Sequence, residues 1–270
     1  MDECIFCYEK GPYNTIEHII PKSLGNDDFL LHNCVCDKCQ NYFGRAVQSF
    51  VLLKTPFAFW RVKYGTKSKK GKLPSIDFSV PKKDKGKLPI VSKHNDQFVN
   101  FTAHDNGSMS VSMQDKKMLE DVQNGDKTSF KFLLSPKHLV LMGRFLGKMA
   151  IEILADDNRS FALHKDFNKL RKYTRQGITK SIWPIINGQL VDHLDIWKKH
   201  PTKDEESCTL YHYSIVKVDS LHIFIFDIGW ERWGIVLNSQ FPDPSIINQL
   251  NNTECESHKF IWYRDDEWRK

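Results

Sequence analysis

The chain has 270 residues, of which 40% are hydrophobic and 27% are charged, and this ordinary globular composition excludes a disordered protein. No run approaches the roughly 18 uncharged apolar residues of a membrane-spanning helix, since even segment 221–237 contains Asp227, Glu231 and Arg232. The first residues lack the basic and apolar regions of a secretory signal, so we expect a cytoplasmic protein whose thiols are free or metal-bound.

Five of the cysteines lie in the first 39 residues, and four of them form two C-x-x-C pairs, Cys4/Cys7 and Cys36/Cys39. Each pair can bind one ion from a tight turn, a knuckle, and two knuckles complete the four-sulfur tetrahedral site that Zn²⁺ prefers. A redox C-x-x-C pair requires a strand–helix context that this short chain end does not provide. We therefore predict a structural zinc site.

The segment between the knuckles predicts a strand, a loop and a second strand, followed by a helix. Apolar and polar residues alternate around Glu17 and His18 up to Pro21, and the apolar piece 29–31 predicts the returning strand. Residues 37–53 have apolar positions on one helical face and stop before the next proline.

Four segments in this region, CIFC, EHIIPKSLG, HN and CDKCQNYFG, resemble the zinc-knuckle branch of the HNH endonucleases in content and order. The resemblance covers about residues 1–54 and implies a ββα-metal fold, which holds one catalytic metal between hairpin and helix. Two departures are the Asn in place of His as the third letter of the motif, and Glu in place of Asp before the base. The site residues that the resemblance implies are His18 as general base, Asn33 as the middle asparagine, Asn41 as the helix metal ligand and Glu17 as an acidic metal ligand.

The chemistry of these side chains suits phosphodiester hydrolysis. An imidazole exchanges protons near neutral pH, so His18 can take a proton from the attacking water. Oxygen ligands from Asn41 and Glu17 suit Mg²⁺ or Mn²⁺ better than zinc. Asn33 is expected to hold the hairpin and to fix the tautomer of His18. The residues expected to contact the scissile phosphate are Arg45 and Lys22.

The positive charge of the chain is concentrated in residues 51–93, which contain twelve basic and two acidic side chains. Their lysines cluster around Gly and Pro, a pattern typical of extended loops or irregular strands. The segment is predicted either to bind a polyanion, with Lys69 and Lys70 as substrate-binding candidates, or to be a solvated linker.

The remaining residues predict an α+β domain. Residues 97–101 and 108–113 predict a hairpin across an Asn-Gly turn, and 135–155 predict a helix with an apolar stripe. A second, basic helix is expected over 164–175, with a solvated or a nucleic-acid-contacting face. An antiparallel meander is predicted from 210–218, 221–227 and 234–238.

We therefore expect an α+β protein of three parts: an HNH module (1–54), a basic connecting segment (55–95) and an α+β domain for recognition, sensing or dimerisation (96–270). The predicted function is that of a metal-dependent endonuclease acting on double-stranded DNA, with no membrane association. Two alternatives stay open. One is a zinc-stabilised module that binds nucleic acid without catalysis. The other is a nuclease effector that acts only when a partner or ligand engages 96–270, where a homodimer or regulatory partner could form.

Overall fold

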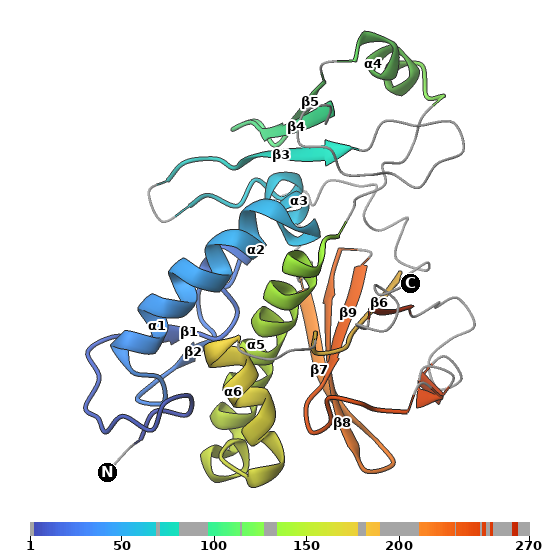
Figure 1. Ribbon diagram of the computed structural model, residues 1–270. Coiled ribbons are helices and arrows are strands. Elements are labelled where there is room, and N and C mark those ends of the chain that lie inside the picture. Colours follow the sequence, from blue (N-terminus) through green and yellow to red (C-terminus); the bar gives the residue numbers. More distant parts are fainter. Residues whose placement is uncertain are drawn as a thin grey trace. The chain divides into compact units, whose positions relative to one another are not determined.

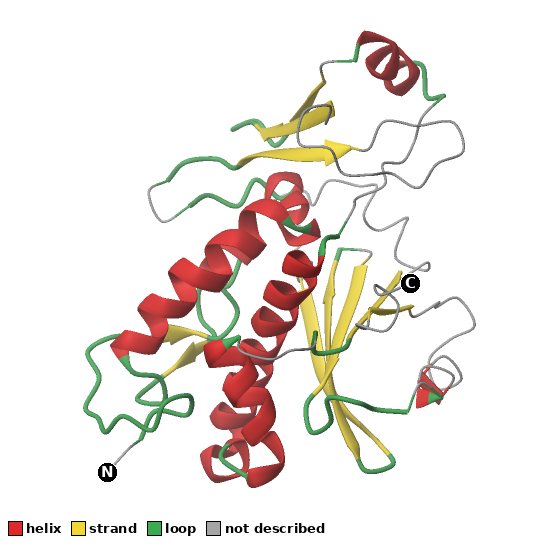
Figure 2. Cartoon of the chain, in the orientation of Figure 1, coloured by secondary structure: helices red, strands yellow, loops and turns green. Residues whose placement is uncertain are grey.

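The computed structural model has a mixed α+β fold of helices and antiparallel sheets (Figures 1 and 2). None of its described helices is long and apolar enough to cross a bilayer. The residues that the structure describes are 3–68, 71–80, 97–113, 115–126, 134–177, 182–189, 211–229, 231–243, 245–246, 249–250 and 261–263.

The chain divides into two compact units, one made of Met1–Phe50 with Pro136–Lys270 and one made of Val51–Ser135. These limits differ from the expected boundaries after residues 54 and 95. The reason is that β3 (Ser75–Val80) pairs with β4 (Gln97–Ala103), which joins both sides of residue 95 in one sheet. The three-part division stays a prediction.

The N-terminal region has the predicted order of strand, loop, strand and helix. Strand β1 (Glu17–His18) pairs antiparallel with β2 (Leu30–Leu31), so that His18 lies opposite Leu30. The predicted helix runs from Asp37 to Lys54 as three joined pieces. It ends where expected, because the residue before Pro56 is extended. The elements of this stretch are η1 (Lys22–Leu24), α1 (Asp37–Phe43), the π-helical turn η2 (Gly44–Gln48) and α2 (Ser49–Lys54).

The second unit corrects one prediction. Its start was expected to be loop or irregular strand, but α3 (Pro56–Lys63) is a helix with proline in its first turn. Ala58 and Val62 pack against Ile76 and Phe101 of the sheet, so burial of the apolar run outweighs the loop-like charge pattern around it. The predicted hairpin is confirmed. The other elements of this unit are β4, β5 (Met109–Met113) and α4 (Lys116–Gln123).

The first unit is built around the long helix α5 (Pro136–Ala162). Figure 1 shows α5 between the β1–β2 region and the sheet, with α6 (Asn168–Gln176) beside it. The sheet has the strand order β10-β6-β9-β8-β7 and is antiparallel throughout, so the predicted meander is confirmed. Its strands are β6 (Ile185–Gln189), β7 (Tyr211–Val218), β8 (Leu221–Ile228), β9 (Glu231–Val236) and β10 (Ile261–Tyr263); the short helix η3 (Lys165–Phe167) precedes α6.

Helix α5 is buried on nearly all sides, which explains its high apolar content. Its apolar residues form core, as predicted, and they include Leu139, Phe145 and Leu146. Three charged residues, Arg144, Lys148 and Glu152, are also buried in it. Their spacing of four places them along one side of the helix.

Candidate active site and zinc cluster

The four knuckle cysteines converge on one point, as their spacing predicts. Their sulfur atoms all lie within 4.8 Å of one another, and none of the four forms a disulfide. A tetrahedral zinc with Zn–S bonds of about 2.3 Å requires sulfur atoms about 3.8 Å apart. The cluster is therefore consistent with a structural zinc site.

The cysteines also compete for one negative charge in the absence of a cation. A hydrogen bond from the thiol of Cys39 lowers the pKa of Cys4 to about 5, against the opposing effect of burial. Burial raises the pKa of Cys36 to about 12. Four thiolates in this space would repel one another, and a divalent cation removes this repulsion. The donor set thus fits a bound zinc ion.

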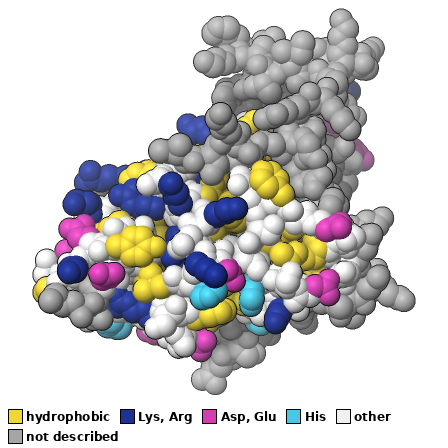
Figure 3. Space-filling model, turned by 60° about the horizontal axis from the view of Figure 1, so that its bottom comes forward, with side chains coloured by type: hydrophobic (Ala, Val, Ile, Leu, Met, Phe, Trp, Pro, Cys, Tyr) yellow, Lys and Arg dark blue, Asp and Glu magenta, His cyan; other side chains and the backbone are white. Residues whose placement is uncertain are grey.

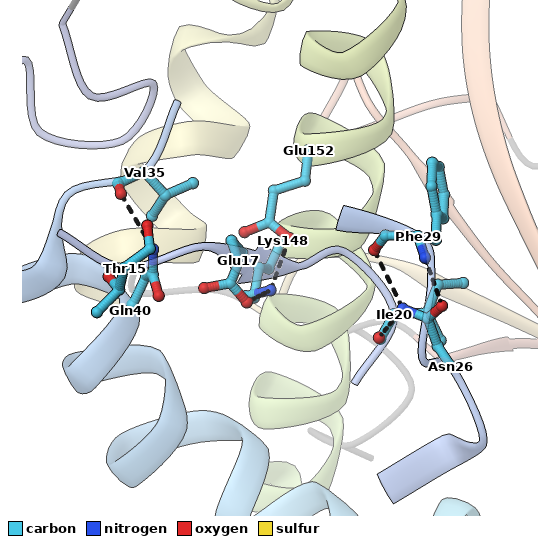
Figure 4. Close-up of polar contacts among 9 residues, drawn as sticks. All are labelled: Thr15, Glu17, Ile20, Asn26, Phe29, Val35, Gln40, Lys148 and Glu152. Atoms are coloured by element: carbon cyan, nitrogen blue, oxygen red, sulfur yellow. Dashed lines mark hydrogen bonds and ion pairs between the residues drawn. The ribbon is translucent and has the colours of Figure 1, made fainter. Parts of the chain in front are cut away.

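The hairpin loop before the second knuckle is held by Asn26, a residue that the sequence analysis did not single out. The buried Nδ2 of Asn26 donates to the carbonyl oxygens of Ile20 (2.7 Å) and Phe29 (3.1 Å). Its Oδ1 accepts from the backbone N–H of Phe29 (2.9 Å) (Figure 4). These hydrogen bonds hold the loop in place although β1 and β2 pair over only two residues each.

Glu17 lies in a buried ion-pair cluster with α5, shown at the centre of Figure 4. The Nζ of Lys148 is 2.9 Å from Glu17 Oε1 and 2.6 Å from Glu152 Oε2, and the Lys148 side chain is fully buried. Burial alone would lower the pKa of Lys148, but the Glu152 and Glu17 carboxylates raise it. Lys148 is therefore an ammonium ion that fixes one oxygen of Glu17.

Glu152 is the second carboxyl group of this cluster, which contains a single cation. Two carboxyl groups face one ammonium ion, and burial raises the pKa of Glu152 well above its usual value. Its Oε1 is buried and accepts no hydrogen bond within the described part of the chain. Glu152 is therefore the member of the cluster whose negative charge is disfavoured by burial.

His18 is half-buried and follows Glu17 directly on β1, and it makes no ion pair with the Lys148 cluster. On the following helix, Asn41 is exposed. Its neighbour Gln40 contacts the start of the hairpin, since Nε2 donates to the carbonyl oxygens of Thr15 (3.2 Å) and Val35 (3.2 Å) (Figure 4).

The other predicted site residues lie in different surroundings. Asn33 is exposed, and its backbone has a left-handed conformation with φ of 53°. Lys22 forms an exposed ion pair with Asp27 at 2.7 Å, and Arg45 is exposed on η2. Lys69 and Lys70 lie outside the described residues. The structure thus pairs Glu17 and His18 on one strand, while their contacts with Asn33 and Asn41 stay predictions.

Arginines from α5 and α6 attach the N-terminal region to the rest of its unit. The first tyrosine that they bind is Tyr42 on α1, whose hydroxyl accepts from Arg144 Nη2 at 2.7 Å. The second is Tyr8, whose hydroxyl accepts from Arg171 Nη2 at 2.9 Å. Arg159 Nη1 donates to the carbonyl oxygen of Asn33 at 3.1 Å. These contacts were not predicted; a charge inside an apolar helix is the signal that marks Arg144, and no comparable pattern marks Arg159 or Arg171.

Residues 4–53 match the HNH endonuclease family, a span that includes the zinc cluster, the hairpin and most of the following helix. Comparisons with curated proteins and with solved structures gave no match for the chain. The order of knuckle, hairpin and helix in the structure agrees with this family assignment. Residues 4–53 of this chain are therefore an HNH endonuclease domain.

Proposed function

We propose that this protein is a metal-dependent endonuclease that hydrolyses phosphodiester bonds in DNA, with a structural zinc ion held by the four knuckle cysteines. The observation that carries the proposal is the HNH endonuclease domain at residues 4–53, in which β1 presents His18 directly after Glu17. A nuclease also accounts for the basic segment 51–93, because cations that neutralise phosphates supply much of the affinity for DNA.

In this proposal His18 activates the attacking water. Its imidazole is half-buried, so it is both reachable from solvent and restrained, and it makes no hydrogen bond with the described residues. An imidazole can accept a proton at neutral pH and pass it to solvent. The predicted part of Asn33 is to restrain the orientation of this ring, as a positioning residue.

Glu17 and Asn41 are proposed to hold the catalytic cation, Mg²⁺ or Mn²⁺. When bound, the cation would stabilise the negative charge that develops on the phosphate and on the leaving oxygen. Lys148 takes one carboxylate oxygen of Glu17, and the second accepts no hydrogen bond from the described residues. Asn41 is exposed, so its carboxamide oxygen is accessible from solvent. Both are oxygen ligands, as these cations prefer.

Exposed cationic side chains are proposed to bind the phosphates of DNA. Arg45 is exposed, and Lys22 pairs, among the described residues, only with the exposed Asp27, so both can exchange solvent or a weak partner for a phosphate. Figure 3 shows dark-blue Lys and Arg side chains gathered on one part of the described face. Lys69 and Lys70 are proposed as further phosphate contacts.

A plasmid cleavage assay tests the proposed function. Zinc-loaded protein with Mg²⁺ or Mn²⁺ is expected to nick or linearise supercoiled DNA, and His18→Ala is expected to abolish cleavage while folding and zinc content persist. His104→Ala is the matched control, because His104 is an exposed histidine of the β4–β5 hairpin in the other unit. Cleavage by a well-folded His18→Ala protein would contradict the role of His18. Binding without cleavage by the native protein, both alone and after addition of a lysate fraction, would contradict the nuclease.

One observation favours a regulated form of the same activity. The cluster of Lys148, Glu152 and Glu17 connects α5 directly with the catalytic strand, so a partner or ligand that moves α5 would move Glu17. In that case the purified protein would be inactive alone and active after addition of a lysate fraction. Full activity of the purified protein would exclude this form.

A further inference from the structure

A pocket of about 520 Å³ lies between the first zinc knuckle and α6, and none of the residues proposed for catalysis lines it. Its α6 side consists of residues spaced by three and four, which form one face of the helix. None of the residues that line it is acidic, and three are cationic. The lining residues are Phe6, Cys7, Tyr8, Asn168, Arg171, Lys172, Arg175 and Gln176.

Arg175 is held in place before any ligand arrives. Its Nε donates to the sulfur of Cys39 at 3.2 Å, and its guanidinium carbon lies 4.0 Å from the ring centroid of Tyr42. Its two terminal amino groups make no hydrogen bond within the described part of the chain. A fixed guanidinium with free terminal N–H groups matches the oxygens of a phosphate, and little side-chain entropy remains to be lost on binding.

Lys172 supplies a second cation one turn earlier on the same face. Its side chain is exposed and forms neither an ion pair nor a hydrogen bond with the described residues. Arg171, by contrast, is already bound to the carbonyl oxygens of Ala162 and Leu163 and to the Tyr8 hydroxyl. Arg171 therefore adds positive potential to the pocket, while Lys172 and Arg175 have N–H donors that can bind a ligand.

Tyr8 forms the wall of the pocket on the knuckle side. Tyr8 is 51% exposed although its hydroxyl is bound by Arg171, and its backbone φ is 62°. A bulky residue with positive φ is a rare conformation, so the turn that follows Cys7 presents this ring at an energetic cost. A half-exposed aromatic ring beside cations is a surface on which unpaired bases of a nucleic acid can stack.

We propose that this pocket binds a backbone phosphate of the nucleic-acid substrate, with Lys172 and Arg175 as its ligands. The phosphate is a singly charged diester, which suits two cations with no acidic neighbour. The claim that this phosphate belongs to the nucleic-acid substrate rests on the proposed function. The claim that the pocket binds a phosphate rests on the pocket residues alone. Through this site α6, which lies outside the HNH endonuclease domain, would add a contact with the DNA backbone.

Two lysines of α6 give a matched test. Lys172 lines the pocket and Lys169 does not, although both are exposed residues of the same helix with the same charge. Binding of a fluorescent DNA duplex is measured by anisotropy at several salt concentrations, in a His18→Ala background that keeps the strand intact. Lys172→Ala is expected to weaken binding roughly 5- to 10-fold at low salt and to reduce the salt slope by about 0.9. Lys169→Ala should stay within about twofold.

Arg175→Lys extends the test, because it keeps the charge but removes the two-pronged donor. It should weaken binding with unchanged zinc content, as measured on the same samples. Equal effects of Lys172→Ala and Lys169→Ala, or no effect of either, would overturn the proposal.

Calorimetry with inorganic phosphate separates the two sources of the anion. A phosphate affinity that disappears in Lys172→Ala while DNA binding is unchanged would identify a site for free phosphate and overturn the strand assignment. If the native protein never cuts DNA but the two lysines still differ, the nuclease proposal fails and the phosphate site stands.

Discussion

Helix α5 has two sides that differ in chemistry. Towards the HNH endonuclease domain it presents Arg144 and Lys148, which bind Tyr42 and Glu17. Towards the sheet it contacts β8 and β9, and its remaining buried residues are mostly apolar. The first side makes a few directional contacts with named atoms, while the second excludes water over a wide area.

The two sides therefore have different consequences for stability and geometry. Apolar burial stabilises the fold roughly in proportion to area, and it tolerates replacement by residues of similar volume. A buried ion pair gains little net stability, because desolvation offsets its attraction, but it penalises any arrangement that leaves one charge unpaired. We infer that the sheet side mainly stabilises the unit, and that the domain side fixes the position of Glu17. Four predictions sharpen this comparison.

The largest effect is expected from zinc removal. Cys36→Ser should unfold the HNH endonuclease domain, because structural zinc contributes on the order of 10 kcal/mol to small zinc modules. Hydrogen exchange should then show residues 4–50 fully exchanging while β8 and β9 stay protected, since the sheet has its own apolar core. Persistent protection of 4–50 in a zinc-free protein would contradict the structural role of the metal.

The second prediction concerns Lys148→Met, which leaves the carboxyl groups of Glu17 and Glu152 buried without their cation. Removal of one partner from such a cluster typically costs about 3–5 kcal/mol, and urea unfolding measures the loss. Adding Glu152→Gln should recover part of it, because one unpaired carboxylate disappears. If Lys148→Met alone were as stable as the native protein, the cluster would not exist as described.

A truncation inside α5 provides the apolar counterpart. Leu146→Ala removes a fully buried side chain and should cost about 2–5 kcal/mol through lost burial and the remaining cavity. Because Leu146 is not part of the ion-pair cluster, the Mg²⁺ concentration for half-maximal cleavage should not change at a temperature where the variant is folded. A large shift in this concentration would show that the apolar residues of α5 also affect metal binding at Glu17.

The smallest effect is expected at the contact between α5 and α6. A Cβ atom at Gly147 would lie 2.6 Å from Thr174 Oγ1 and 3.1 Å from Leu170 Cδ1. Gly147→Ala should therefore destabilise the protein by about 1–2 kcal/mol, despite the better helix propensity of alanine. Thermal unfolding checks this result, and a stabilised variant would mean that α6 moves away easily.

Local patterns in the sequence predicted the zinc cluster, the hairpin and the helix from Asp37 to Lys54, because cysteine spacing, strand alternation and the residue before Pro56 act over short distances. The contact of Lys148 with Glu17 joins residues 131 positions apart, and no spacing rule reaches so far. Helix α3 was missed for a different reason. Its buried apolar residues lie in a lysine-rich segment. The loop was predicted from the lysine pattern, and the apolar pattern of the helix was not used.

The candidate site was predicted in part. The sequence motif supplied Glu17 and His18, and the structure adds what holds them, namely Lys148 for the carboxylate and Asn26 for the loop. Side-chain amides inside loops and charges inside helices are common in sequences, and only the folded contacts show which of them act on a site. Gln40 is a further example, since the motif indicates Asn41 while Gln40 contacts the hairpin.

The most direct test of the central claim is to look for the proposed catalytic cation. Crystals of the His18→Ala protein with DNA and Mn²⁺ would be measured at a wavelength where manganese scatters anomalously. The account predicts one peak about 2.1 Å from a Glu17 carboxylate oxygen and close to a carboxamide oxygen of α1, which would also decide between Asn41 and Gln40. A bound DNA strand with no manganese at Glu17 would contradict the account.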